Sequence, residues 1–113
     1  MTADELPVIA RAFDLAREMT ERTRKLPRDV KFVLGDRMLT TTYDVLDLLV
    51  EAKYSRAKRA MLDRANILLE RLRFQLWLCV EEKLVTVRQY EYVARIIHEV
   101  GSMVGGWRKH ASE

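Results

Sequence analysis

Residues 56–83, RAKRAMLDRANILLERLRFQLWLCVEEK, have the clearest helical pattern in the sequence. Neither proline nor glycine interrupts the stretch, and its apolar residues recur at helical spacing. At 100° per residue, most of them fall on one arc of a helix. This core-facing arc consists of Met61, Leu62, Ala65, Leu68, Leu69, Leu72, Leu76, Cys79 and Val80. Such an arc is typical of a helix that packs into a helical bundle.

The same helix carries a second apolar stripe on its opposite side, made of Ala60, Ile67, Phe74, Trp77 and Leu78. A monomeric bundle has no use for two apolar stripes on one helix, and large exposed apolar patches usually mark interfaces. We therefore predict an oligomer interface, formed by Ile67, Phe74, Trp77 and Leu78. The alternative is an irregular bundle that wraps this helix more fully.

Two further helices are predicted before this one, at 3–24 and 28–54. Thr2 is the expected N-cap of the first, and Pro27 separates the two. The expected buried face of the first consists of Leu6, Ile9, Phe13, Ala16 and Met19. The second has one stripe of Leu34, Met38, Val45, Leu49 and Ala52, and an adjacent stripe of Phe32, Leu39, Tyr43, Leu46 and Val50. Gly35 indicates either a close backbone approach or a late helix start.

The last helix is predicted at 86–110, where Thr86 and Gln89 have the spacing of a capping box. Gly101 and Gly105 lie four residues apart, and a mid-helix glycine costs about 1 kcal/mol relative to alanine. The pair predicts that another backbone approaches closely there. The expected buried face consists of Val93, Ala94, Ile97, Val100, Gly101, Val104 and Trp107.

The architecture expected from these helices is a single all-α domain over residues 1–113. The connections are only a few residues long, so neighbouring helices should run antiparallel, up-down-up-down. The acidic N-terminus lacks the apolar run of a signal peptide, and no stretch is apolar enough to span a bilayer. We therefore expect a cytoplasmic protein with no membrane partner.

Basic residues are concentrated in two segments, although the net charge is only +3. Residues 22–31 carry a net charge of +4. Residues 53–73 carry seven basic residues against two acidic ones, a net charge of +5. Clustered positive charge favours polyanions or acidic partners, whereas the simpler interpretation is a solvated helix face. The candidate nucleic-acid or partner-binding residues are Lys53, Arg56, Lys58, Arg59, Arg64, Arg71 and Arg73.

Three tyrosines also bear on nucleic-acid binding. Tyr54, Tyr90 and Tyr92 have rings that can stack on unpaired bases, although aromatic residues of a bundle more often belong to its core or rim. No helix-turn-helix pattern or base-reading constellation is visible. Any nucleic-acid binding should therefore be electrostatic, with little sequence preference.

The sequence offers no pattern typical of catalysis or metal binding. His98 and His110 are its only histidines, and no Glu-x-x-His pair of a di-iron bundle is present. Cys79 lies on the core-facing arc, where a small buried hydrophobe is expected. We predict no catalytic residues, no metal and no cofactor.

Several stretches resemble the accessory variability proteins (Avd) of diversity-generating retroelements. They are LPR (26–28), FVLGDR (32–37), LLVEAKY (48–54), RAN (64–66), LRF (72–74) and EVGSMVGGW (99–107). The resemblance implies a four-helix bundle that assembles as a homopentameric ring. It also implies a non-catalytic partner of the retroelement reverse transcriptase that binds template RNA or cDNA and supports mutagenic copying.

Two departures from that family pattern concern nucleic-acid contact. Ser102 stands where many relatives carry a basic residue, and Trp77, Glu81 and Glu82 make the stretch after LRF less basic. The competing hypothesis is the related four-helix-bundle family encoded in intervening sequences of ribosomal RNA genes, acting as an interaction protein. The third hypothesis is a small enzyme with an unrecognised active site.

Overall fold

The computed structural model describes residues 5–111, with the side chain of Leu6 left out. Four long helices make up most of it: α1 (Glu5–Arg24), α3 (Asp36–Tyr54), α4 (Lys58–Glu81) and α5 (Val87–His110). A short helix, α2 (Arg28–Val30), and a π-helical turn, η1 (Lys31–Gly35), run directly into α3. No strand occurs among residues 5–111. The predicted Thr2 N-cap lies outside the described residues.

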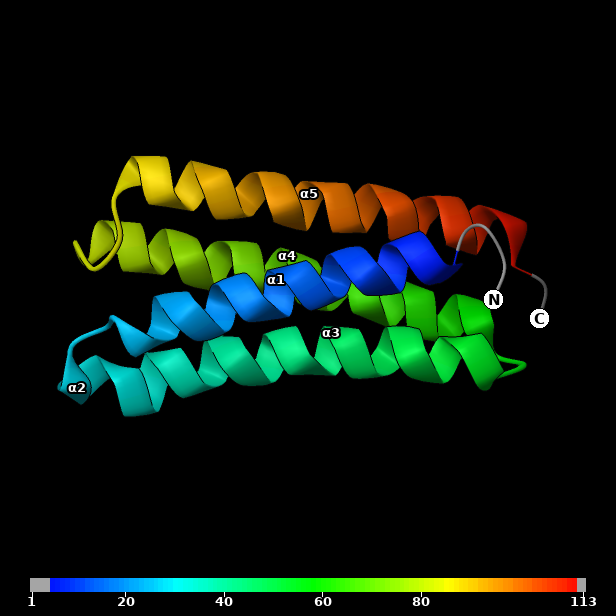
Figure 1. Cartoon of the computed structure of the whole chain (residues 1–113), viewed down its shortest axis with the longest axis horizontal. Helices are drawn as coiled ribbons and strands as arrows, with labels where there is room; N and C mark the ends of the chain where they lie inside the picture. Colours follow the sequence, from blue (N-terminus) through cyan, green and yellow to red (C-terminus); the bar gives the residue numbers. More distant parts are fainter. Residues whose placement is uncertain (1–4, 112–113) are drawn as a thin grey trace.

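The four long helices run alternately up and down in one elongated bundle (Figure 1). Each packs on the next along the chain, and α1 also packs on α5, which closes the bundle. The start of α1, the α3–α4 connection and the end of α5 lie together at one end of this 43 × 23 × 18 Å molecule (Figure 1). The predicted all-α up-down-up-down bundle is confirmed.

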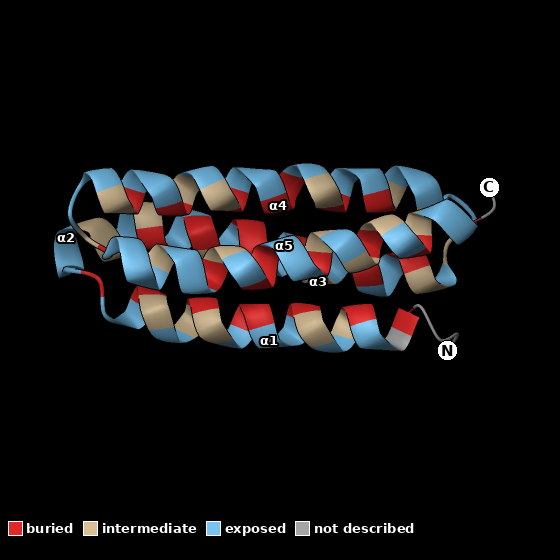
Figure 2. Ribbon diagram, turned by 90° about the horizontal axis from the view of Figure 1, so that it is seen from above, coloured by how far each residue is buried: buried red, intermediate tan, exposed pale blue. Residues whose placement is uncertain are grey.

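The core runs along the bundle axis as one buried stripe from each helix (Figure 2). On α4, seven of the nine predicted core residues are buried, and Met61 and Val80 are half-buried at the edges of the stripe. On α3, Met38, Val45, Leu49 and Ala52 are buried as predicted, whereas Leu34 is only half-buried. In the adjacent α3 stripe, Leu39 and Leu46 are half-buried, and Phe32, Tyr43 and Val50 are exposed.

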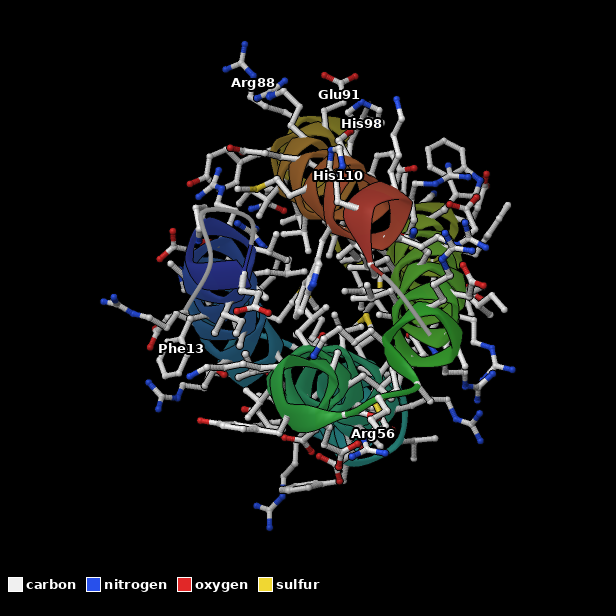
Figure 3. The ribbon with its side chains drawn as sticks, turned by 90° about the vertical axis from the view of Figure 1, so that its right-hand side faces the viewer. Phe13, Arg56, Arg88, Glu91, His98 and His110 are labelled. Carbon is white, nitrogen blue, oxygen red and sulfur yellow. The ribbon has the colours of Figure 1, made fainter. Side chains whose placement is uncertain are left out.

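The predicted buried face of α1 is wrong in its phase. Val8, Ala12 and Leu15 belong to the core, together with the predicted Ala16 and Met19. Phe13 is instead 55% exposed and points away from the bundle (Figure 3). At 100° per residue, the buried arc is centred on Ala12, Leu15 and Met19; Ala16 lies within this arc, whereas Phe13 lies beyond its edge. Ile9 is half-buried, and the Leu6 side chain lies outside the described residues.

Close packing explains one of the three glycines singled out in the sequence. Gly35 is buried, and an added Cβ would lie 3.4 Å from Leu26 Cδ1. The close approach there is made by a side chain, and the helical segment begins earlier, at Arg28.

The backbone approach predicted at Gly101 and Gly105 is wrong within the chain. A Cβ at Gly101 would meet only the side chains of Asn66 and Leu69, at 3.6 and 3.9 Å, and a Cβ at Gly105 would meet nothing within 4 Å.

The α4–α5 connection is fixed by hydrogen bonds at both of its ends. Leu84 N donates to Cys79 O and Lys83 N donates to Val80 O, the pattern of a Schellman cap. Thr86 Oγ1 accepts from Gln89 N at 3.1 Å, and Gln89 Oε1 accepts from Thr86 N at 2.9 Å. The predicted capping box is therefore confirmed. Of the residues predicted on the buried face of α5, Ala94 and Gly101 are half-buried and the others are buried.

Candidate nucleic-acid interface

Two of the seven predicted basic residues stabilise the end of the bundle that holds the α3–α4 connection. Lys58 Nζ donates to the carbonyl oxygens of Ala52 at 2.7 Å and Lys53 at 3.0 Å, at the C-terminal end of α3. A cation there satisfies carbonyls that have no partner within the helix and complements the helix dipole. Arg59 Nε donates to Ala111 O at 3.0 Å and ties the start of α4 to the end of α5.

Arg73 is also occupied, on the side of α4 that faces α5. Its guanidinium forms an ion pair with Glu70, donates to Tyr90 Oη at 3.4 Å and lies over the Phe74 ring at 4.7 Å. The hydrogen bond from Arg73 lowers the pKa of Glu70, and the Glu70 carboxylate raises the pKa of Arg73. Arg73 is thus separated from the other predicted arginines, because it lies on a different side of the same helix.

Arg64 and Arg71 lie together as predicted, in a groove of about 390 Å³ between α3 and α4. Neither has a hydrogen bond or an ion pair with any residue in the 5–111 range. Arg56, in the α3–α4 connection, is exposed and likewise has no partner among the described residues (Figure 3). These three guanidiniums are available to an external anion.

The groove also contains residues that the charge pattern did not single out. Arg37 of α3 lines it together with Thr40, Thr41, Asp44 and Leu68. Arg37 lies outside both basic segments and reaches the groove only through the pairing of α3 with α4. Its spacing to Thr41 and Asp44, four and seven residues on, puts all three near one face of α3. This spacing is the one feature of the sequence that links Arg37 to the other groove residues of α3. It does not reveal that this face of α3 packs beside α4.

Lys53 and two of the three tyrosines remain at the surface. Lys53 Nζ lies 4.8 Å from the centre of the Tyr54 ring and donates to Tyr54 Oη at 3.1 Å. Tyr54 is 77% exposed and Tyr92 is exposed. Tyr90 is half-buried, with its ring 5.2 Å from that of Trp77 in an edge-on arrangement. Tyr54 therefore remains a candidate for base stacking, and Tyr90 is part of the packing between α4 and α5.

The second apolar stripe of α4 is exposed in the single chain. Ile67, Phe74 and Leu78 are roughly half-exposed, and Trp77 is 40% exposed despite its contact with Tyr90. The bundle therefore does not wrap this face of α4 with its own helices. Subunit contact through the stripe stays a prediction.

Cys79 lies in the core as predicted. Its thiol is fully buried and contacts Met38 Sδ at 3.8 Å, and burial raises the pKa of the thiol. Over the described part of the chain, no three His, Cys, Asp or Glu side chains gather into a potential metal site. Over the same range, no helix combines the length and the hydropathy needed to cross a bilayer.

Comparison with known proteins identifies the family. No curated protein and no solved structure matches the chain. A family model described as bAvd-like matches residues 8–111, nearly the whole chain and all four long helices. The match confirms the resemblance to the Avd family that the motifs between residues 26 and 107 indicate. The matched region also includes most of α1, where no such motif was found. The chain therefore belongs to the bAvd-like family of accessory variability proteins.

Proposed function

We propose that this bundle is the accessory subunit of a diversity-generating retroelement: it binds the element's reverse transcriptase and its template RNA or cDNA, and supports mutagenic cDNA synthesis in the cytoplasm. The observation that carries the proposal is the family match over residues 8–111. In this role the protein supplies binding surfaces, and the polymerase supplies the chemistry.

The α3–α4 groove is the surface that we assign to nucleic acid. Arg64 and Arg71 have no partner among the described residues, so phosphate binding there breaks no existing ion pair. Binding by Arg side chains to phosphates is sequence-independent and depends strongly on salt, because each contact releases counterions.

The exposed stripe of α4 is the surface that we assign to self-assembly into a ring, and from the resemblance to the Avd family we expect five subunits. A ring with more than two subunits is heterologous, so each subunit must offer two different surfaces that fit each other. The exposed aromatic side chains of Phe13 and Tyr43, which line a pocket between α1 and α3, are the candidates for the second surface. A ring would repeat the groove in every subunit, so weak phosphate contacts would reinforce one another through effective concentration.

An RNA titration tests the nucleic-acid part of the proposal. The purified protein should bind RNA at low salt, and the affinity should fall steeply as salt rises. The double charge reversal Arg64→Glu/Arg71→Glu should flatten this salt dependence without changing the oligomer mass. The matched control is Arg88→Glu/Arg95→Glu, which makes the same charge change on exposed arginines of α5 and should bind as the unaltered protein does.

The reverse transcriptase could instead be what the groove binds, through acidic residues of its own. If the protein does not bind RNA even at low salt, the basic residues do not contact nucleic acid. Co-purification with the reverse transcriptase, tested with the same two double variants, then shows whether the groove contacts the polymerase.

A further inference from the structure

We propose that Arg37 completes a phosphate-binding track along the α3–α4 face, on which a single nucleic-acid strand lies parallel to the helices. The inference rests on the proposed function and deepens it, because it names the form of the nucleic acid and adds a binding residue from a second helix. The track consists of Arg56, Arg64, Arg71 and Arg37.

The first argument is the lack of partners for these arginines. Elsewhere on the surface, Arg11, Arg22, Arg24 and Arg73 each form an ion pair with a carboxylate of the chain. Arg88 and Arg95 have no ion pair among the described residues either, but the arginines of the groove come from two helices and line one space. Among residues 5–111, Arg37 has no ion pair or side-chain hydrogen bond, as is also true of Arg64 and Arg71. Three guanidiniums that line one groove repel one another, and a bound anion removes that repulsion while accepting charge-assisted hydrogen bonds.

The second argument is the spacing of the arginines along the bundle. Arg64 and Arg71 are seven residues apart, which is about 10 Å at a rise of about 1.5 Å per residue. The contact between Met38 Sδ and Cys79 Sγ places Arg37 on the far side of Arg71 from the α3–α4 connection. Phosphates recur along a nucleic-acid strand at intervals shorter than this spacing, with about 3.4 Å of axial rise per nucleotide in a DNA duplex, so one strand would present more than one phosphate to Arg64 and Arg71. The track therefore fits an extended polyanion better than one small phosphate ion.

The third argument favours a single strand over a duplex. Tyr54 is 77% exposed and lies at the Arg56 end of the track, two residues before Arg56 in the chain. An exposed aromatic ring beside basic side chains offers a stacking surface for an unpaired base. Bases within a duplex already stack on one another, so this ring would gain nothing from them.

Asp44 allows a test in which a substitution should strengthen nucleic-acid binding instead of weakening it. The Asp44 carboxylate lines the groove with the three arginines, and it has no ion pair with any residue of the described chain. Its charge opposes that of a phosphate bound beside it. Asp44→Asn should therefore strengthen strand binding, by about threefold at low salt for a partly exposed charge.

The test uses a labelled single-stranded RNA and a duplex of the same sequence, each of about 16 units, so that even the shorter A-form duplex spans the 43 Å bundle. Fluorescence anisotropy is recorded over a range of salt concentrations. Arg37→Gln should reduce the slope of log affinity against log salt by about 0.7, the value for one phosphate contact on a single strand. The control, Arg88→Gln, should leave the slope unchanged. Tyr54→Ala should weaken single-strand binding about tenfold and leave duplex binding unaffected.

Three results would overturn the inference. If Arg37→Gln keeps the unaltered slope while Arg64→Glu/Arg71→Glu loses binding, the groove binds nucleic acid without Arg37, and only the proposed function survives. If the duplex binds as tightly as the single strand and Tyr54→Ala changes neither, the strand form is wrong. If neither RNA binds at low salt but polyglutamate does, the track binds an acidic protein, and the nucleic-acid part of the proposed function fails as well.

Discussion

Arg64 and Arg73 lie on the same helix, yet their surroundings give them opposite roles. Arg73 has an ion pair, a tyrosine hydroxyl and an aromatic face, all within its own chain. Arg64 has none of these partners among the described residues and lines an open groove. Breaking the Arg73 contacts to bind a phosphate would leave Glu70 unpaired beside the incoming negative charge. The local neighbours of each guanidinium, and not the segment's net charge, therefore decide which arginine is available for binding.

Cys79 is the residue at which a structural role is easiest to separate from a functional one. Replacing it with alanine removes a buried sulfur that contacts Met38 and leaves a small cavity. The Cys79→Ala protein should lose about 1–2 kcal/mol of unfolding free energy in urea titrations. RNA binding and oligomer mass should not change. Selective loss of either in a stably folded variant would contradict the assignment.

The same residue gives a chemical control for that experiment. Burial raises the pKa of the Cys79 thiol, so very little reactive thiolate forms in the folded protein near neutral pH. A thiol reagent at pH 8 should label the protein only as fast as it unfolds. Rapid labelling under native conditions would show that the site is open to solvent.

At the scale of the helices, one residue at the C-terminal end of α4 has a backbone conformation that costs free energy, and a substitution by glycine should remove this cost. Lys83 has φ of 60° at the position of the Schellman cap where glycine is usual. A left-handed conformation costs a residue with a Cβ about 1–2 kcal/mol, and glycine avoids the cost but loses more entropy on folding. Lys83→Gly should therefore raise the unfolding free energy by about 0.5–1 kcal/mol. A lower thermal midpoint than that of the unaltered protein would contradict this account of the cap.

The glycines of α5 provide a second prediction at this scale. A Cβ at Gly105 meets nothing within 4 Å inside the chain, so Gly105→Ala should gain up to about 1 kcal/mol from helix propensity alone. Chemical denaturation of the two proteins measures this gain. If the variant instead forms a smaller oligomer, the backbone that Gly105 accommodates belongs to another copy of the chain.

How much of each helix could be predicted depended on how clearly its sequence separates buried from exposed positions. The core-facing arc of α4 has more apolar residues than the stripe on the opposite side, and seven of its nine predicted core residues are buried. In α1, Phe13 and Ala12 belong to two overlapping arcs, and the choice between them is made by packing against α3 and α5. In the groove, Arg37 could not be assigned because only the pairing of α3 with α4 brings it to Arg71. Side chains within one helix follow from periodicity, whereas contacts between helices do not.

At the scale of the whole molecule, the bundle presents two different kinds of surface next to each other on α4. The outer stripe of Ile67, Phe74 and Leu78 is apolar, and the adjoining groove with Arg64 and Arg71 is basic. The two surfaces meet at Arg71, which lines the groove and also lines a pocket with Ile67 and Phe74 of the stripe. The oligomer mass of Arg64→Glu/Arg71→Glu therefore tests whether the proposed assembly and the proposed nucleic-acid binding use these two surfaces independently.

Phe74→Glu tests assembly. Phe74 is 60% exposed in the isolated chain, so a glutamate there should be tolerated by the fold of the monomer. In a subunit contact the same carboxylate would be buried without a partner, which is costly in free energy.

Light scattering should report a mass well above 13.3 kDa for the unaltered protein and a mass close to that value for Phe74→Glu. Tyr92→Glu is the control and should keep the full mass, because Tyr92 is exposed and lies seven residues before Glu99, on the side of α5 that faces Arg11 of α1. Because Phe13 is the candidate on the opposing surface, Phe13→Glu should reduce the mass as well, and an equimolar mixture of the two variants should form dimers, since each retains one intact surface. A monomeric unaltered protein would end the ring proposal, and Phe74→Glu with an unchanged mass would show that subunits meet elsewhere.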